Sequence, residues 1–337
     1  MVADGFARLP SGGIISYRDT GAVSGACRTF VFVHGVGSNK SRMHYIQLTN
    51  AGTWDSLLDY VPSNARAITI SIRGYGDSKS LSAEQLSLKS PPSELHQQHT
   101  TDFLEFLEYV TTELGVPQKS DGGGITSLFW SKGCSLALGL YYFPRKTDIL
   151  ERSVTSIIFY EPPSSAVFGQ AHDPTAVACL LTPSDEDPGM RFVKYASGFF
   201  HNPPEYLASK GETQPVLKYY HSGISDPAFR ARSIVASDRD NISAKQNWYL
   251  VDVPEEREAA AKKAVENIAR SELRRVGIMW GSEGPPASLL GCWRLEKWIL
   301  GTEGCRVETK TREFKGGNHF VHWYRPKEFW SAVLELA

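Results

Sequence analysis

The stretch SLFWSKGCSLALGL, residues 127–140, joins residues typical of a strand to small residues typical of a helix, and Ser131 stands at the junction. A serine hydroxyl becomes a good nucleophile when a base takes its proton and dipoles stabilise the oxyanion that follows. A sharp strand-to-helix turn lifts the serine to the carboxyl edge of a sheet and aims the next amide at that oxyanion. Ser131 is therefore a candidate nucleophile with Lys132 N–H as an oxyanion donor, and the alternative is a serine that only caps a helix.

The residues around Ser131 depart from the usual Gly-x-Ser-x-Gly pattern at one position. Phe129 stands where that pattern has a small residue, whereas Gly133 is present. Cys134 is a rival nucleophile, but it lies three residues into the expected helix and would pack inward, where thiols are usually inert.

Apolar runs of strand length recur along the chain, and most are followed by segments of helix length. This alternation predicts an α/β fold with a mostly parallel sheet, because parallel strands covered by helices on both faces are apolar throughout. The expected strands are 29–33, 67–72, 125–130, 154–160, 276–280 and 305–311, with an edge hairpin at 5–9 and 13–18. Expected helices are 101–114, 255–275 and 326–337, and residues 79–98 are expected to form a loop.

Residues 164–253 break the alternation, because they contain many prolines and aromatic residues but no clear strand. Their aromatic content is too high for a disordered linker, and long insertions in such folds are often functional. We expect a core formed by residues 1–163 and 254–337, with residues 164–253 as a cap, or lid, over a pocket.

The charge balance excludes two classes of partner. Lysine plus arginine number 36 and aspartate plus glutamate 37 in 337 residues, which gives a net charge of −1. Nucleic acid or an anionic membrane would require clustered basic residues, so we expect neither. The sequence shows no signal peptide and no run of about 18 apolar residues, so we expect a cytoplasmic protein.

The sequence offers no sign of a metal or an organic cofactor. The five cysteines lie far apart and lack ligand spacing, which argues against a zinc site and a disulfide framework. The glycine-rich segments do not match a phosphate loop or a dinucleotide-binding motif. The oligomeric state is left open.

Two further loops supply candidate partners for Ser131. After the strand at 29–33, His34-Gly35-Val36 allows a tight turn whose Val36 N–H would join Lys132 N–H in an oxyanion hole. Near the end of the chain, a glycine-rich loop holds His319, whose imidazole suits a general base. His322 is the second choice, since its place before Trp323 suggests packing.

Together these motifs resemble the α/β-hydrolase superfamily over nearly the whole chain. The His-Gly loop, the Arg-Gly-x-Gly-x-Ser turn at 73–78, the serine turn, the insertion and the late histidine occur in that order. Within the superfamily the chain is similar to fungal secondary-metabolism hydrolases related to the AK-toxin cluster hydrolase and the mycophenolic-acid-pathway acyl-CoA hydrolase. That resemblance implies a polyketide-like acyl substrate, carried on coenzyme A or on a carrier protein.

The acid that would orient His319 has two candidates. Most of the superfamily carries an aspartate after the strand at 276–280, but this sequence has Glu283 one position early and Gly284 in its place. Glu161 follows the strand at 154–160, is held by two prolines, and sits where the acyl-CoA hydrolase subgroup carries its acid. We favour Glu161 and keep Glu283 as the alternative.

The sequence thus predicts a serine esterase or thioesterase. His319 would take the proton of Ser131, and the acyl-enzyme would be released by water or by an intramolecular hydroxyl, which would form a macrolactone. Ser131 argues against dehalogenases and epoxide hydrolases, which place an aspartate at this position. The alternative is a non-catalytic receptor or scaffold with the same fold. The expected substrate pocket is lined by His34, Gly35, Trp130, Phe168 and Trp323.

Overall fold

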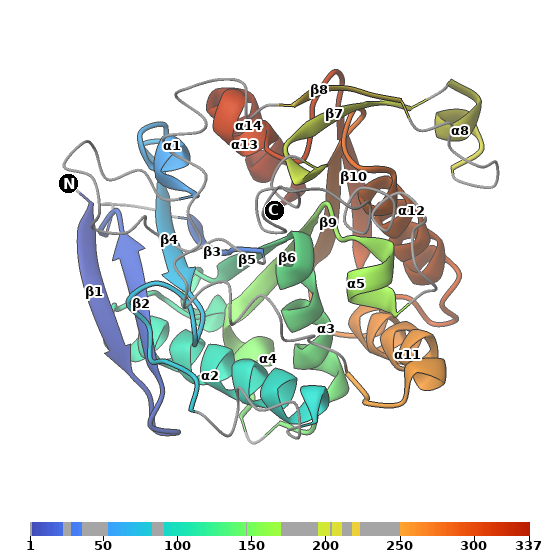
Figure 1. Cartoon of the computed structure of the whole chain (residues 1–337). Helices are drawn as coiled ribbons and strands as arrows, with labels where there is room; N and C mark the ends of the chain where they lie inside the picture. The colour runs from blue at the N-terminus through green and yellow to red at the C-terminus, as the bar shows by residue number, and fades with distance from the viewer. Residues whose placement is uncertain are drawn as a thin grey trace.

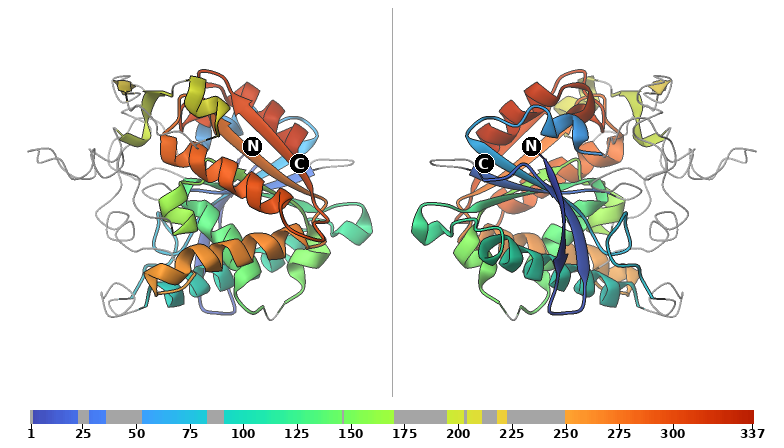
Figure 2. Two further views of the ribbon diagram at one scale, coloured as in Figure 1. Left: turned by 90° about the vertical axis from the view of Figure 1, so that its right-hand side faces the viewer. Right: turned by 90° about the vertical axis from the view of Figure 1, so that its left-hand side faces the viewer.

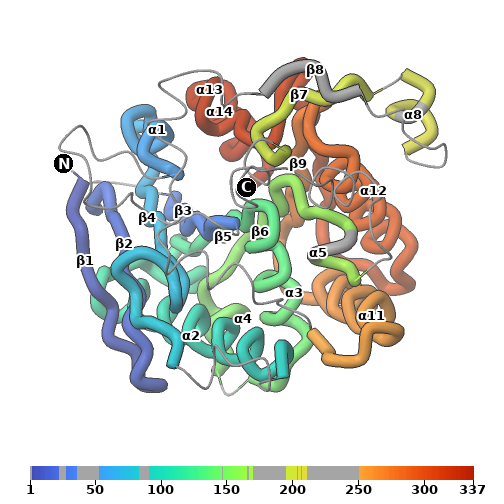
Figure 3. Tube along the Cα trace, in the orientation of Figure 1, coloured from blue at the N-terminus to red at the C-terminus, as the bar shows by residue number. Residues whose placement is uncertain are grey.

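Within the residues that the computed structural model describes, eight strands form one sheet (Figure 1). The described residues are 2–22, 28–35, 53–82, 91–145, 147–169, 195–202, 204–210, 218–222 and 250–337 (Figure 3). In spatial order the strands are β1 (Ala3–Arg8), β2 (Ile14–Asp19), β4 (Ala65–Ser71), β3 (Arg28–Val33), β5 (Ile125–Trp130), β6 (Val154–Tyr160), β9 (Arg275–Gly281) and β10 (Glu308–Phe314).

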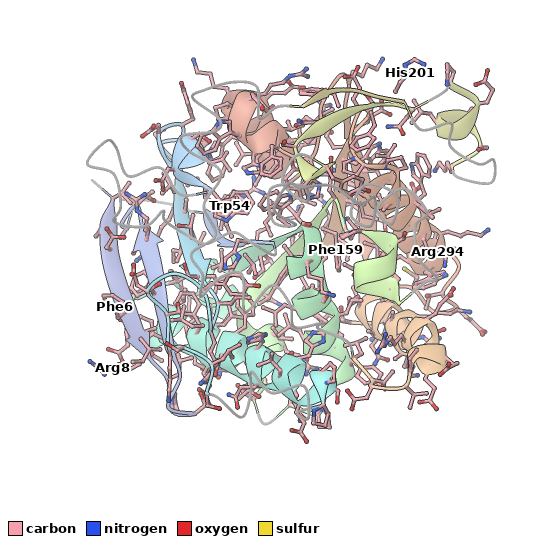
Figure 4. All side chains as sticks on the ribbon, viewed as in Figure 1. Phe6, Arg8, Trp54, Phe159, His201 and Arg294 are labelled. Atoms are coloured by element: carbon pink, nitrogen blue, oxygen red, sulfur yellow. The ribbon has the colours of Figure 1, made fainter. Side chains whose placement is uncertain are left out.

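The sheet is mostly parallel, as the sequence predicts. β1, β2 and β4 are joined by antiparallel pairings, and every pairing from β4 to β10 is parallel. The hairpin β1–β2 lies at the edge of the sheet (Figure 2), where Phe6 is 55% exposed and, with Arg8, projects from the outer strand (Figure 4). β4, β5 and β9 are buried along their whole length, which explains their largely apolar sequences.

Helices cover both faces of the sheet (Figures 1 and 2). One face carries α2 (Pro92–Thr112), α3 (Cys134–Tyr142), α4 (Ile149–Ser153), α11 (Arg257–Ala269) and α12 (Pro286–Leu300). The other face carries α1 (Asp55–Leu58), α13 (Val321–Tyr324) and α14 (Pro326–Leu336). Among the helices in the described ranges, none is long and apolar enough to span a bilayer.

Alternation along the strands sorts side chains between the two helical layers. Phe129 and Phe159 belong to the core under α2, α3 and α11, whereas Trp130 and Tyr160 belong to the core under α13 and α14. The last residue of β5 and the last residue of β6 therefore face the same side of the sheet.

Several element boundaries differ from the sequence prediction. The helix predicted at 255–275 ends early, since α11 covers Arg257–Ala269 and Arg275 already belongs to β9. α2 begins at Pro92 and not at residue 101, so the end of the predicted loop is helical. Its first turns bury Leu95, His96 and His99, and buried histidines hide the apolar stripe from a reading of hydropathy. β10 begins at Glu308 and not at residue 305, because the chain is still turning there, with Cys305 N–H bonded to the carbonyl of Thr302.

The segment predicted to be a cap contains a small sheet that the sequence did not indicate. β7 (Gly198–His201) and β8 (Lys218–Ser222) pair antiparallel, and short strands that contain Phe-Phe and Tyr-Tyr follow the β-propensity of aromatic residues. Between residues 164 and 253 the described elements are α5 (Ser164–Phe168), β7 (Gly198–His201), α8 (Pro204–Ala208) and β8 (Lys218–Ser222). Most of the predicted cap lies outside the described residues.

Candidate active site

Ser131 lies at the turn between β5 and α3, in the short 3-10 segment Ser131–Gly133. Its φ is 53°, in the left-handed region that costs a residue with a side chain about 1–2 kcal/mol. Strain of this kind is concentrated at functional sites, where surrounding packing maintains it. The backbone of Ser131 therefore has the geometry of a nucleophile turn.

The His-Gly loop lies directly against this turn. A Cβ on Gly35 would lie 2.8 Å from Ser131 Cβ, and a Cβ on Gly133 would lie 2.5 Å from the carbonyl oxygen of His34. Both glycines are therefore required by close contact between the two loops. Lys132 follows Ser131 in the same turn, whereas Val36, the other predicted oxyanion donor, lies outside the described residues.

Phe129 is accommodated because its side chain points away from the turn. It is fully buried on the opposite face of β5 and packs edge-to-face against Phe103 of α2, with 5.4 Å between ring centroids. The residue that departs from the Gly-x-Ser-x-Gly pattern thus fills the core and does not crowd Ser131.

Glu161 and His319 form a buried pair at the same edge of the sheet. His319 Nδ1 is hydrogen-bonded to Glu161 Oε2, and both side chains are almost inaccessible to solvent. Glu161 directly follows β6 and has a φ of 49°, a second strained residue one strand away from Ser131. Its other oxygen, Oε1, accepts a hydrogen bond of 2.7 Å from Gly281 N–H, which fixes the carboxylate in place.

Glu283, the alternative acid, is held in a different environment. Its backbone N–H donates to the carbonyl of Gly317 and its carbonyl accepts from Phe200 N–H, so the loop after β9 is tied to its neighbours through the main chain. A Cβ on Gly284 would lie 3.0 Å and 3.1 Å from the two oxygens of Glu161. The carboxylate of Glu161 therefore occupies the space beside Gly284, the position at which most of the superfamily carries its acid.

His319 also lies beside the strand that ends in Ser131. The rings of His319 and Trp130 are 5.2 Å apart, and the carbonyl of His319 accepts hydrogen bonds from Trp130 and Tyr160. Ser131 Oγ and His319, both within the described part of the chain, are not hydrogen-bonded to each other. Catalytic hydrogen bonds are often long before substrate binds and shorten in the complex.

His34 supports the backbone of the loop after β3. It is fully buried; its Nδ1 donates to the carbonyl of Gly35 at 2.7 Å and its Nε2 accepts from Ile72 N–H at 3.2 Å. Burial lowers the pKa of His34 to about 4, so the ring is neutral and both nitrogens are used in holding the loop after β3 to the end of β4.

Two other predicted pocket residues are placed in packing roles. Phe168 is fully buried and packs edge-to-face against Trp298 of α12, with 5.4 Å between ring centroids. Trp323 of α13 is half-buried against the core under α14. The structure therefore groups Ser131, Glu161 and His319 but distributes the predicted pocket residues between the site and the two cores.

Cys134, the alternative nucleophile, and His322, the alternative base, are both buried. Cys134 is fully buried, and burial raises the pKa of its thiol well above the usual value, so the nucleophilic thiolate is disfavoured. His322 is fully buried among aromatic rings, and burial lowers its pKa well below the usual value. Its Nδ1 lies 3.4 Å from the hydroxyl of Tyr160.

Reasoning from the sequence missed two asparagines that hold the loops after β9 and β10. Asn318 donates from Nδ2 to the carbonyl of Ser197 and accepts from Phe320 N–H through Oδ1, so its side chain links the loop to the segment before β7. Asn202, just after β7, donates to the carbonyls of Ser282 and Gly284. Asn318 could have been noticed from its place beside His319 in a glycine-rich loop. The contact of Asn318 with Ser197 and those of Asn202 with the loop after β9 depend on tertiary structure and could not.

A mostly parallel eight-stranded sheet in this order, covered by helices on both faces and carrying a sharp strand-to-helix turn after β5, is the arrangement of the α/β-hydrolase fold. Comparison of the sequence with models of protein families gave no match, and comparison with curated proteins gave none.

Solved structures support the assignment of the fold. The structure is similar to a bromoperoxidase from Bacillus anthracis, at 16% identity over 99% of each chain and a TM-score of 0.58. It is also similar to a putative lipase from Acinetobacter baumannii, at 13% identity over 99% of this chain and 92% of that one, with a TM-score of 0.59. An enol-lactonase from Burkholderia xenovorans matches at 12% identity over 98% and 99% of the chains, with a TM-score of 0.56. At identities of 12–16%, this structural similarity shows the fold alone.

Proposed function

We propose that the protein is a serine hydrolase that acts on an acyl ester or thioester through an acyl-enzyme. The observation that carries the proposal is the buried hydrogen bond between Glu161 and His319, next to a serine held at a φ of 53° on the neighbouring strand. A carboxylate bonded to Nδ1 keeps the proton on that nitrogen and leaves Nε2 free to take the serine proton.

In the proposed mechanism His319 Nε2 accepts the proton of Ser131 Oγ as that oxygen attacks the acyl carbonyl. The backbone N–H groups of Lys132 and Val36 stabilise the tetrahedral oxyanion. The carbonyl re-forms, the C–O or C–S bond to the leaving group breaks, and His319 gives its proton to that group. A water molecule or a hydroxyl then attacks the acyl-enzyme while His319 takes its proton; the bond between the acyl carbon and Ser131 Oγ breaks, and His319 returns the proton to Oγ.

The proposed substrate is a polyketide-like acyl group, carried on coenzyme A or on a carrier protein in the cytoplasm. The resemblance to fungal secondary-metabolism hydrolases supports this class, as does Glu161, which sits where that subgroup carries its acid. Similar structures include proteins described as a putative lipase, a putative aryl esterase and an enol-lactonase, which supports ester or lactone chemistry. Release by water gives a free acid, and release by an internal hydroxyl gives a macrolactone.

The test is mass spectrometry of the intact protein after treatment with a fluorophosphonate and, separately, with a panel of acyl thioesters. We expect one covalent adduct on the wild type and none on Ser131→Ala. Ser135→Ala is the matched control, because Ser135 is buried four residues further on in α3 and its hydroxyl makes no hydrogen bond.

The mass of the released product distinguishes a free acid from a product lighter by one water, which identifies lactone formation. Ligand binding without any adduct or turnover would contradict the proposal. It would instead favour the alternative, a non-catalytic receptor or scaffold.

A further inference from the structure

The carbonyl oxygen of His319 accepts two side-chain hydrogen bonds. Trp130 Nε1 donates to it at 3.2 Å and the hydroxyl of Tyr160 donates to it at 2.9 Å. Each donor directly precedes another member of the proposed triad, Trp130 before Ser131 and Tyr160 before Glu161. The backbone of the base is therefore bonded to the two strands that carry the nucleophile and the acid.

The two donors form one unit across the sheet. Trp130 and Tyr160 are directly paired in the parallel register of β5 and β6, and their rings stack with 6.2 Å between centroids and an angle of 21°. Trp130 is 2% exposed and Tyr160 is 0% exposed, so water does not compete for either hydrogen bond. Hydrogen bonds in such an environment are electrostatically stronger than exposed ones.

The direction of both hydrogen bonds is unambiguous, since a carbonyl only accepts and an indole N–H only donates. Burial raises the pKa of Tyr160 well above its usual value, so the phenol keeps the proton that it donates. His322 Nδ1 lies 3.4 Å from the same hydroxyl.

Aromatic side chains pack against the rings of Trp130 and Tyr160 and hold them in place. The ring of Trp54, labelled in Figure 4, packs edge-to-face against Trp130 with 5.8 Å between centroids and lies 4.7 Å from the ring of His322. His322 in turn lies 4.7 Å from Trp130. Neither donor can swing away from the carbonyl without displacing these rings, because interiors are close-packed.

We propose that Trp130 and Tyr160 are positioning residues that hold the backbone of His319 so that its imidazole stays between Ser131 and Glu161. This inference rests on the proposed function. The imidazole is fixed at one end by Glu161 and through its own backbone by the two donors, and Nε2 is the ring nitrogen that Glu161 does not engage. Displacement of a catalytic group by about 1 Å costs up to about 100-fold in rate, so positioning of this kind contributes to kcat.

The experiment compares Tyr160→Phe, Trp130→Phe and the double variant with the wild type, on whichever ester or thioester the fluorophosphonate-reactive enzyme hydrolyses. Tyr17→Phe is the matched control, because it removes another tyrosine hydroxyl, bonded to Tyr109 at 3.2 Å, between β2 and α2. We expect kcat to fall roughly five- to tenfold in each single variant, the loss expected for one hydrogen bond, and further in the double variant. KM should stay within about twofold, and Tyr17→Phe should leave both constants unchanged.

A second readout is independent of turnover. The proton shared by His319 Nδ1 and Glu161 should give a downfield proton resonance in the wild type, and this resonance should shift or broaden in Tyr160→Phe and Trp130→Phe but not in Tyr17→Phe. Variants that lose thermal stability but keep kcat and the resonance of the wild type would overturn the proposal. If the wild type neither reacts with the probe nor turns over, the proposed function fails, and the resonance still decides whether the two donors position His319.

Discussion

Replacement of Glu161 by glutamine tests the triad with almost no change in shape. In the wild type, Oε1 accepts from Gly281 N–H at 2.7 Å and Oε2 is bonded to His319 Nδ1. Gly281 N–H only donates, so the amide oxygen of the glutamine must face Gly281 and its NH2 must face His319. His319 Nδ1 then has to accept, which moves the imidazole proton to Nε2, the atom that should take the serine proton.

We therefore expect kcat to fall about 10⁴-fold, the loss produced when a triad histidine is held in the wrong tautomer, equivalent to about 5 kcal/mol of transition-state stabilisation. The hydrogen bond to Gly281 remains, so the free energy of unfolding should change by only about 1 kcal/mol. Ester hydrolysis gives kcat and urea unfolding gives stability, with Glu283→Gln as the control that keeps near wild-type activity. A Glu161→Gln variant within tenfold of wild type, beside an inactive Glu283→Gln variant, would assign the acid to Glu283.

Three further predictions concern the turn around Ser131. Gly35→Ala should slow fluorophosphonate labelling and destabilise the fold by about 1–3 kcal/mol, because the new methyl group would lie 2.8 Å from Ser131 Cβ; labelling at the wild-type rate would contradict this. Ser131→Gly should be about 1 kcal/mol more stable than Ser131→Ala in urea unfolding, since only glycine adopts a φ of 53° without cost, and equal stabilities would show that the turn is unstrained. Burial lowers the pKa of Lys132 to about 7, so the folded protein binds this proton less tightly than the unfolded chain does. The fold is therefore destabilised increasingly as pH falls from about 10 to about 7, and by a constant amount below about 7. Lys132→Met should therefore be more stable than wild type at pH 6, by up to roughly 5 kcal/mol, with the gap closing near pH 10, whereas Lys262→Met on the exposed side of α11 should show no such dependence.

The central strands were predictable because burial on both faces leaves a continuous apolar run. β5 and β6 were predicted to the residue for this reason. β10 was displaced by three residues in the prediction because it is an edge strand with alternating exposure and a polar sequence, ETKTREF. The start of α2 was missed because its buried face is built partly from histidines, which hydropathy counts as polar.

The site was less predictable than the fold, because much of it is defined by contacts between distant segments. Ser131 and His319 stand in glycine-rich loops, which local sequence reveals, and the choice of Glu161 was helped by its place at a strand end. The hydrogen bonds from Trp130 and Tyr160 to His319 were not predictable, since they join residues 189 and 159 positions apart. His34 shows the converse: its motif is local, but tertiary contacts use both of its ring nitrogens in the backbone.

Gly284, which follows β9, restricts how related sequences can vary. A Cβ at position 284 would lie 3.0 Å and 3.1 Å from the two oxygens of the Glu161 carboxylate, closer than an ordinary contact, so a side chain at one position disfavours an acid at the other. The two positions should therefore covary: a glutamate after β6 with a glycine after β9, or an aspartate after β9 with a small residue after β6. Two residues more than a hundred positions apart would then report where an enzyme of this fold keeps its acid. Evolution from one arrangement to the other would involve substitutions at both positions. It would pass through an intermediate that has an acid after neither strand.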